Sequence, residues 1–146
     1  MFNTYSFQEV IVTIRNKAGA ILSTKGQGTG SISVNYAADR SAKNVASDGT
    51  VVISKLSDRS GSVEMSVQQT SEINKQLMKW FAAVEGDDVS SAEWAGMTIT
   101  IESKTTGAKK TCTGVAFTKI PDESFSAEAG NVDWSFMCAN VSTQPI

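Results

Sequence analysis

Residues 62–84 read SVEMSVQQTSEINKQLMKWFAAV, and two different hydrophobic periodicities meet within them. The first part alternates apolar and polar residues, as in a strand with one buried and one solvated face. The second part repeats apolar residues at the spacing that lines one side of a helix. We therefore expect a strand followed directly by a helix, and the core residues of that helix are predicted to be Ile73, Leu77, Trp80, Phe81 and Val84.

The predicted helix, over 71–85, has sequence signals at both ends. Ser71 is a suitable N-cap, Glu72 lies where the helix dipole favours an acidic side chain, and Gly86 follows the last turn. Its polar side carries two lysines as its only cations, which is few for a helix that binds a membrane surface. The apolar stripe is therefore predicted to cover a sheet.

Alternating or β-rich segments surround this stretch, and turn signals such as Asp48-Gly49 separate them. We expect strands over 5–14, 20–23, 31–36, 51–56, 62–69, 97–102, 110–117 and 132–138. Residues 37–49 are predicted to form a loop with a short strand near 43–46, and the polar tail 140–146 is predicted to be frayed. The core of the sheet is expected to contain Val63, Met65, Val67, Ile99, Ile101, Trp134 and Phe136.

The fold class that follows is mainly β, an antiparallel β-sandwich or barrel with one flanking helix, in one domain over residues 1–146. The 146 residues include 19 Ser, 14 Thr and 11 Gly, a composition that suits solvated strand faces joined by tight turns. Regularly spaced apolar residues argue against a disordered chain. The 13 cationic residues against 15 acidic ones argue against a dedicated nucleic-acid binder.

Residue types that carry most enzyme chemistry are scarce in this sequence. It contains no histidine, which removes the commonest general base and every Ser-His arrangement. The glycines of 26–30 lack both the spacing and the following helix of a phosphate-binding loop. The adjacent acids Asp122 and Glu123 are typical of a solvated loop. We expect no catalytic residue, no metal site and no cofactor, and therefore no enzyme.

The two cysteines are Cys112 and Cys138. The sequence shows no secretory leader and no apolar run long enough to cross a bilayer, so we expect no membrane partner. In a reducing cytoplasm the two thiols are expected to stay free and buried, and a disulfide is the alternative.

Several segments, taken in order, resemble the tail tube proteins of contractile-tail bacteriophages. The first is NTYSF at 3–7, and the second is SGSVEMSV at 60–67, which leads into the helix. The third is AFTKIP at 116–121, followed by EAG at 128–130 and WSF at 134–136. Together these segments cover most of the chain.

The resemblance implies a virion structural protein whose hexameric rings stack into the inner tail tube and conduct phage DNA into the host. The implied partners are further copies of the chain, the tail sheath, baseplate and tail-terminator proteins, and DNA that passes without specific binding. The implied location is the virion tail, and the host cytoplasm during assembly. The alternatives are a tube subunit of a contractile secretion or injection system, and a non-catalytic β-sandwich binding module.

The polar sides of two predicted strands are candidates for the wall of the tube's lumen. A channel that conducts DNA must not bind its phosphates, and hydroxyl and carboxylate side chains do not bind them. The predicted lumen-facing residues are Glu64, Ser66, Gln68, Thr98, Thr100 and Glu102. The alternative places the same side chains on the outer wall. Residues 37–60 and Met1–Thr4 are the predicted ring-to-ring contacts, because they are polar or extended and are not needed for the core.

Overall fold

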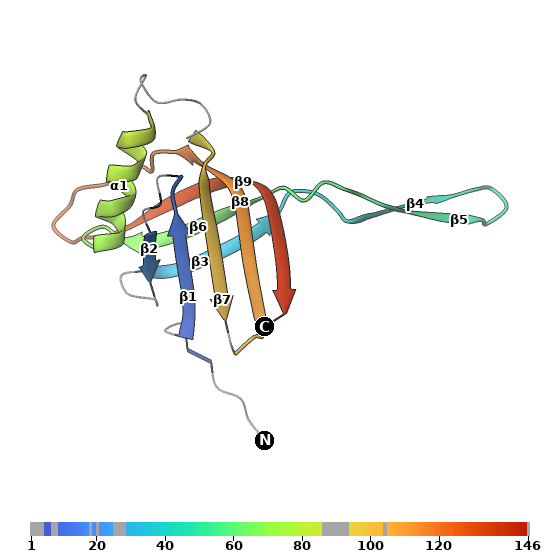
Figure 1. The fold of residues 1–146 in the computed structure, drawn as a ribbon, viewed down its shortest axis with the longest axis horizontal. Helices are drawn as coiled ribbons and strands as arrows, with labels where there is room; N and C mark the ends of the chain where they lie inside the picture. Colours follow the sequence, from blue (N-terminus) through green and yellow to red (C-terminus); the bar gives the residue numbers. More distant parts are fainter. Residues whose placement is uncertain are drawn as a thin grey trace.

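Seven strands form one antiparallel sheet in the order β2-β1-β7-β8-β9-β6-β3, and two more form a separate hairpin, β4–β5 (Figure 1). The structure is a computed structural model and describes residues 5–6, 9–17, 19, 21–24, 29–85, 94–103 and 105–145. The elements are β1 (Val10–Arg15), β2 (Ile21–Thr24), β3 (Thr29–Tyr36), β4 (Ser41–Val45), β5 (Val51–Lys55), β6 (Gly61–Gln68), α1 (Glu72–Glu85), β7 (Met97–Ser103), β8 (Ala108–Lys119) and β9 (Asn131–Pro145). The expected mainly β class with one flanking helix is confirmed for the described residues.

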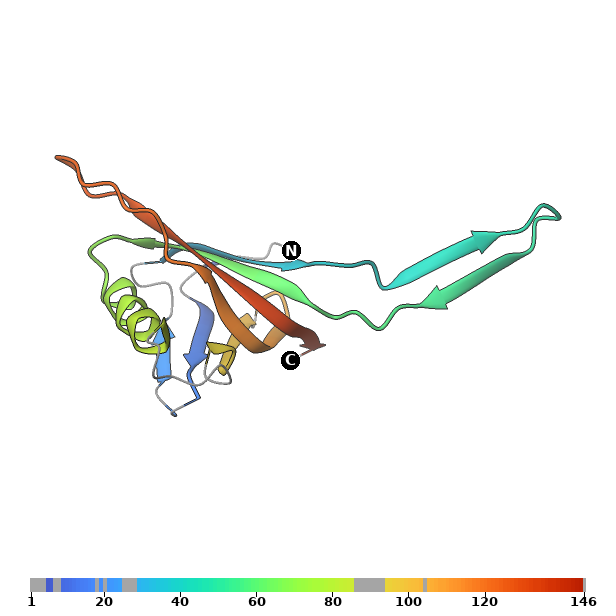
Figure 2. The ribbon, with the colours of Figure 1, turned by 90° about the horizontal axis from the view of Figure 1, so that it is seen from above.

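The sheet curls into half of a barrel. β2 and β3 are its two edge strands, yet only four residues separate Thr24, at the end of β2, from Thr29, at the start of β3. Consecutive Cα atoms lie 3.8 Å apart, so these two strand ends are within about 19 Å of each other. α1 packs on the concave side of the curl, next to β2 and β6 (Figure 2).

The long strand β9 joins the two halves of the sheet. It pairs with β6 over residues 131–138 and with β8 over residues 135–145. The expectation that 140–146 would be frayed is therefore wrong for the described residues, because β9 continues to Pro145. Val141 lies fully buried opposite Cys112 of β8, and its burial and the pairing with β8 hold a segment whose composition is largely polar.

Among the other elements, β4 and β1 differ most from the expected ones, while the remaining strand ends differ by one or two residues. Residues 37–49, expected as a loop with a short strand, contribute β4, which pairs with β5 around a turn at Asp48-Gly49. Gly49 has a φ of 89°, and Asp48 accepts the Thr50 N–H at 3.0 Å, so this turn has the chemistry that its sequence predicts. The first strand, expected over 5–14, begins at Val10 in the described part of the chain.

The core fills the space between α1 and the concave face of the sheet. Phe117 lies at its centre, with ring centroids 5.2 Å from both Phe81 and Phe136 and 5.6 Å from Trp134. All the residues expected in the sheet core are buried: Val63, Met65, Val67, Ile99, Ile101, Trp134 and Phe136. On α1, three of the expected residues are buried (Ile73, Leu77 and Phe81), and two are half-buried at the rim of the core (Trp80 and Val84).

The start of α1 is fixed by a short network of hydrogen bonds. The Ser71 hydroxyl accepts the Asn74 N–H at 3.3 Å, as an N-cap does, and donates to the Gln68 carbonyl at 2.6 Å. The Asn74 side chain is buried, donates to the Gln69 carbonyl at 3.0 Å, and accepts the Trp134 indole N–H at 2.9 Å. The helix is thus tied to β9 through a satisfied polar pair inside the core. Gly86, expected after the last turn, lies outside the described residues.

Candidate assembly surfaces

The face of the sheet that points away from α1, called here the polar face, carries mainly short polar side chains over β3, β6 and β9, and on its other half it also carries Arg15 beside Thr98 and Lys109 beside Glu102. Antiparallel register places cross-strand partners side by side on one face of a sheet. On β3, β6 and β9 two neighbouring rows of partners are Ser33–Glu64–Ser135 and Ser31–Ser66–Asp133. On the other half of the sheet, the corresponding row is Thr13–Thr100–Thr111–Ser142.

The six residues predicted to face a lumen all lie on this polar face. Glu64 and Gln68 are exposed, and Ser66, Thr98, Thr100 and Glu102 are half-buried. The first three come from β6 and the others from β7, and β9 and β8 lie between these two strands. The structure therefore places the two sets on one surface but does not bring them into contact with each other.

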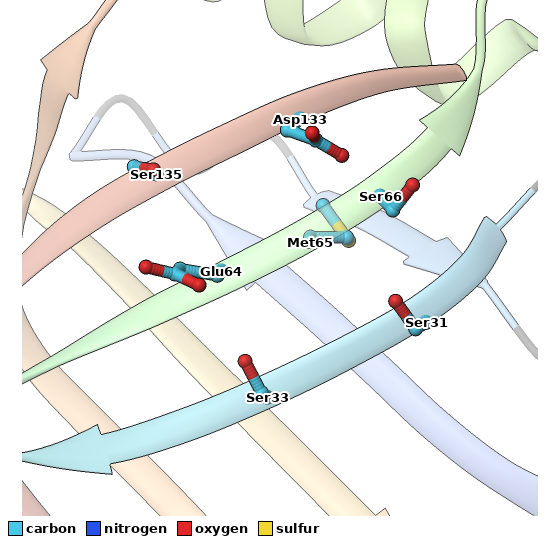
Figure 3. A pocket seen from close by; sticks show the side chains of 7 residues that line it. All are labelled: Ser31, Ser33, Glu64, Met65, Ser66, Asp133 and Ser135. Carbon is cyan, nitrogen blue, oxygen red and sulfur yellow. The ribbon is translucent and has the colours of Figure 1, made fainter. Parts of the chain in front are cut away.

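The polar face is hollowed over β3, β6 and β9. The hollow has a volume of about 380 Å³ and is lined by Ser31, Ser33, Glu64, Met65, Ser66, Asp133 and Ser135. Hydroxyl and carboxylate groups of these strands extend from the ribbon around it (Figure 3). The side chains on this half of the polar face include two acids, Glu64 and Asp133, and no cation among the described residues. Such a surface repels phosphate groups instead of holding them.

Four of these lining residues were not singled out from the sequence: Ser31, Ser33, Asp133 and Ser135. The sequence did indicate that these residues lie on the polar side of a strand, because both 31–36 and 132–138 alternate apolar and polar residues. What the sequence did not reveal is that β3 and β9 flank β6 on either side. That neighbourhood decides which alternating segments share a surface.

The two outer strands of the sheet each pair with one other strand among the described residues. β3 pairs only with β6, and β2 pairs only with β1. β8 pairs with β9 as far as Lys119, whereas its pairing with β7 ends at Val115. Ala116–Lys119 therefore lie beyond the part of β8 that pairs with β7.

The hairpin β4–β5 projects from the body of the molecule, as both views show (Figures 1 and 2). Every residue of β4 and β5 is exposed. At its root, the Leu56 N–H donates to the Arg40 carbonyl at 2.9 Å, and the Ala37 N–H donates to the Ser60 carbonyl at 3.0 Å. An isolated two-stranded hairpin is marginally stable in water, so the pairing of β4 with β5 stabilises this one only weakly.

A cluster of polar groups holds the root of the hairpin against β8 and β9. Lys110 Nζ donates to the Tyr36 hydroxyl at 2.8 Å and to the Thr143 hydroxyl at 3.0 Å. The Arg40 guanidinium lies 5.7 Å from the centre of the Tyr36 ring. Burial raises the pKa of Tyr36, but the hydrogen bonds with Lys110 and Thr143 and the nearby positive charges outweigh it, so this pKa lies below its usual value.

Cys112 and Cys138 are free and buried. Their mutual hydrogen bond, together with burial, raises the pKa of the Cys138 thiol, which keeps it protonated and unreactive. The part of the chain that the structure describes contains no group of three or more potential metal-ligating side chains. No helix in that part has both the length and the apolar character needed to span a membrane.

The sequence matches the family model described as "Bacteriophage PhiTE tail tube protein" over residues 2–144. The chain belongs to this family. The resemblance read from the sequence is thereby confirmed, and the protein is a structural protein of the phage tail tube family. No curated protein sequence gives a significant match to this tail tube protein.

Solved structures with the same fold come from contractile injection systems. A chain of the extracellular system PVC, in its sheath–tube complex in the extended state, is 13% identical, with a TM-score of 0.59, and the match covers 98% of this chain and 93% of that one. A chain of the anti-feeding prophage tube terminating cap is 13% identical, with a TM-score of 0.61 and coverage of 100% and 95%. A chain of the anti-feeding prophage baseplate is 9% identical, with a TM-score of 0.55 and coverage of 99% and 98%.

Proposed function

We propose that this tail tube protein forms hexameric rings, that the rings stack into the inner tube of a contractile tail, and that phage DNA passes through the tube. The observation that carries the proposal is a polar face without cations over β3, β6 and β9, on an open sheet whose outer strands, β2 and β3, each pair with one strand among the described residues. Pairing of these edges between copies would close a larger barrel and leave the polar faces around a common bore.

The polar face then lines the lumen, and Glu64, Ser66, Gln68, Thr98, Thr100 and Glu102 contribute to its wall. α1 packs on the opposite side of the sheet, so its exposed polar side, with Lys75 and Lys79, points outward to the sheath. A sheath–tube complex, a tube terminating cap and a six-fold symmetrised baseplate are among the structures that share this fold, which supports hexameric symmetry and sheath, terminator and baseplate partners.

Labelling of single cysteines tests the direction of the polar face. In assembled tubes of Glu64→Cys, a maleimide-linked gold particle is expected inside the bore, and in tubes of Lys75→Cys on the outer wall, in cross-sections viewed by electron microscopy. Both native cysteines are buried and give no background in the folded protein. Gold outside for Glu64→Cys and inside for Lys75→Cys would reverse the assignment. Wild-type protein that stays monomeric at high concentration would favour a binding module.

The hairpin β4–β5 is proposed to carry ring-to-ring contacts, together with the rest of residues 37–60. Met1–Thr4, the other predicted contact, lies outside the described residues. The hairpin buries nothing within its own subunit, and a hydrogen bond between Arg40 and Leu56 already closes its base. Replacing residues 41–55 by a short Gly-Ser turn is therefore expected to leave the melting temperature nearly unchanged and to abolish tube formation. Calorimetry and sedimentation measure the two effects, and normal tubes from this variant would contradict the proposal.

The related candidate is a tube of a contractile injection system, which the solved neighbours favour, whereas the family model favours a phage tail. The two differ in what the tube conducts. DNA enclosed in tubes isolated from ejecting particles is expected for a phage tail, and nuclease digestion after tube disruption measures it.

A further inference from the structure

One face of the hairpin β4–β5 combines apolar and cationic side chains. The register pairs Val45 with Val51, Lys43 with Ile53, and Ser41 with Lys55, and these pairs alternate along the hairpin with Asn44–Val52 and Ala42–Ser54. Alternate pairs point to the same side of a two-stranded ribbon. The face that carries Lys43, Val45, Val51, Ile53 and Lys55 is called here the hairpin face.

The hairpin face has no cover within its own subunit. Ile53 is 73% exposed, and Val45 and Val51 are each more than half exposed. Exposed β-branched side chains on a free hairpin are a binding surface or a site of aggregation. The two lysines at the margin of this apolar surface favour a partner that combines an apolar anchor with acidic groups.

The segment 120–128, IPDESFSAE, has that combination. Phe125 is 85% exposed, the most exposed large apolar side chain of the described residues. Three acids flank it, Asp122, Glu123 and Glu128, and the neighbouring cation, Lys119, lies 3.8 Å from Asp122. The segment therefore presents an aromatic anchor with a surplus of negative charge around it.

The segment 120–128 is also held in place before any partner arrives. Pro121 is buried, and Gln69 Nε2 donates to the Ser124 carbonyl at 3.2 Å. The Ser126 hydroxyl donates to the Glu128 carbonyl at 2.8 Å. Preorganisation of this kind lowers the entropy lost on binding.

The hairpin face and the segment 120–128 lie at opposite ends of the elongated subunit in both views (Figures 1 and 2). A contact between them cannot form within one chain and has to join two copies. Because the two surfaces differ, the contact is heterologous and repeats from copy to copy, as a ring or a stack of rings requires.

We propose that the hairpin face of one copy binds the segment 120–128 of the next copy, with Phe125 on the apolar side chains and the lysines opposite the acids. This inference rests on the proposed function, because it names the partner surface of the hairpin within the assembly. It adds that the contact is between copies of this chain and that both charge and an aromatic anchor specify it.

Charge reversal tests the pairing. The variant Lys43→Glu with Lys55→Glu and the variant Glu123→Lys with Glu128→Lys are each expected to lower the yield of sedimenting tubes roughly tenfold or more, because like charges then meet across the contact. Both double substitutions in one chain restore opposite charges and are expected to restore assembly. The matched control is Lys75→Glu with Lys79→Glu, which makes the same charge change on exposed positions of α1 and leaves self-assembly intact.

The outcomes separate the two proposals. Assembly that stays blocked in the combined variant would overturn the pairing with segment 120–128, while loss of tubes on removing the hairpin would still support the proposed function. Normal assembly of the variant Lys43→Glu with Lys55→Glu would also overturn the pairing. Wild-type protein that forms no rings or tubes would overturn the proposed function itself.

Crosslinking gives an independent readout that does not depend on charge. Chains with Ser41→Cys are mixed with chains with Ser124→Cys, assembled, and treated with a short bismaleimide; both positions are exposed, and Phe125 and the apolar side chains of the hairpin face stay in place. A crosslinked dimer that contains one chain of each kind is expected from the proposed contact. The same treatment of unassembled, monomeric protein should give no such dimer. Crosslinking only between like chains would contradict it.

Discussion

Trp134→Ala is expected to lower the free energy of unfolding by about 3–5 kcal/mol. The Trp134 side chain is fully buried near the start of β9, and its ring lies against Phe117 with 5.6 Å between centroids. Its removal leaves a cavity between α1 and the sheet and takes the indole donor from the buried Asn74 oxygen. Urea denaturation followed by circular dichroism measures the change.

Two control variants separate the cavity from the lost hydrogen bond. Trp134→Phe keeps an aromatic ring but leaves the Asn74 oxygen without its donor, so a loss of about 1–3 kcal/mol is expected. Trp94→Ala makes the same truncation at a half-buried position and is expected to cost less than Trp134→Ala. Equal losses for Trp94→Ala and Trp134→Ala would contradict the central position assigned to Trp134.

Gly114→Ala is expected to destabilise the protein by about 2–5 kcal/mol, because two costs add. Gly114 has a φ of 62°, where a residue with a side chain is strained. A methyl group there would lie 2.7 Å from the Cβ of Ala139 on β9. The glycine occupies the point at which β8 has one residue more than β7, between the pairs Met97–Val115 and Ile99–Cys112, so the bulge depends on it.

A matched glycine isolates the strain from the steric contact. Gly107 has a φ of 72°, but a methyl group there would meet nothing within 4 Å. Gly107→Ala is therefore expected to cost about 1–2 kcal/mol from the backbone alone. In the double variant Gly114→Ala with Ala139→Gly, the methyl group of Ala139 is absent. The part of the stability loss that comes from the contact between the two methyl groups should therefore be recovered. A loss in Gly114→Ala no larger than in Gly107→Ala would mean that β9 moves aside freely.

The elements with a strong local period were predictable from the sequence, and those that depend on a distant partner were not. The alternation of 62–69 and the apolar stripe of 71–85 gave β6 and α1 almost to the residue. The end of β9 was missed, since its pairing with β8 and the burial of Val141 are long-range effects. β4 was seen only as a short strand in a loop, because its apolar residues have no core to face within the subunit.

The candidate surface was predictable in part for the same reason. The alternation of apolar and polar residues predicted which side of β6 and of β7 is polar. The structure places the polar residues of both strands on one face of the sheet. Strand order, which brings Ser31 and Asp133 beside Ser66, has no local signature in the sequence. Likewise, the hairpin face and the segment 120–128 lie at opposite ends of the molecule only because of the tertiary arrangement, which the sequence pattern does not reveal.

The length of β9 has a mechanical consequence. Force applied along this strand acts in shear on the hydrogen bonds that join it to β6 and to β8, so many of them resist at once instead of opening one after another. The two halves of the curled sheet are thus coupled through one continuous strand. In the proposed tube, a subunit built in this way would resist shear between the halves of its own sheet.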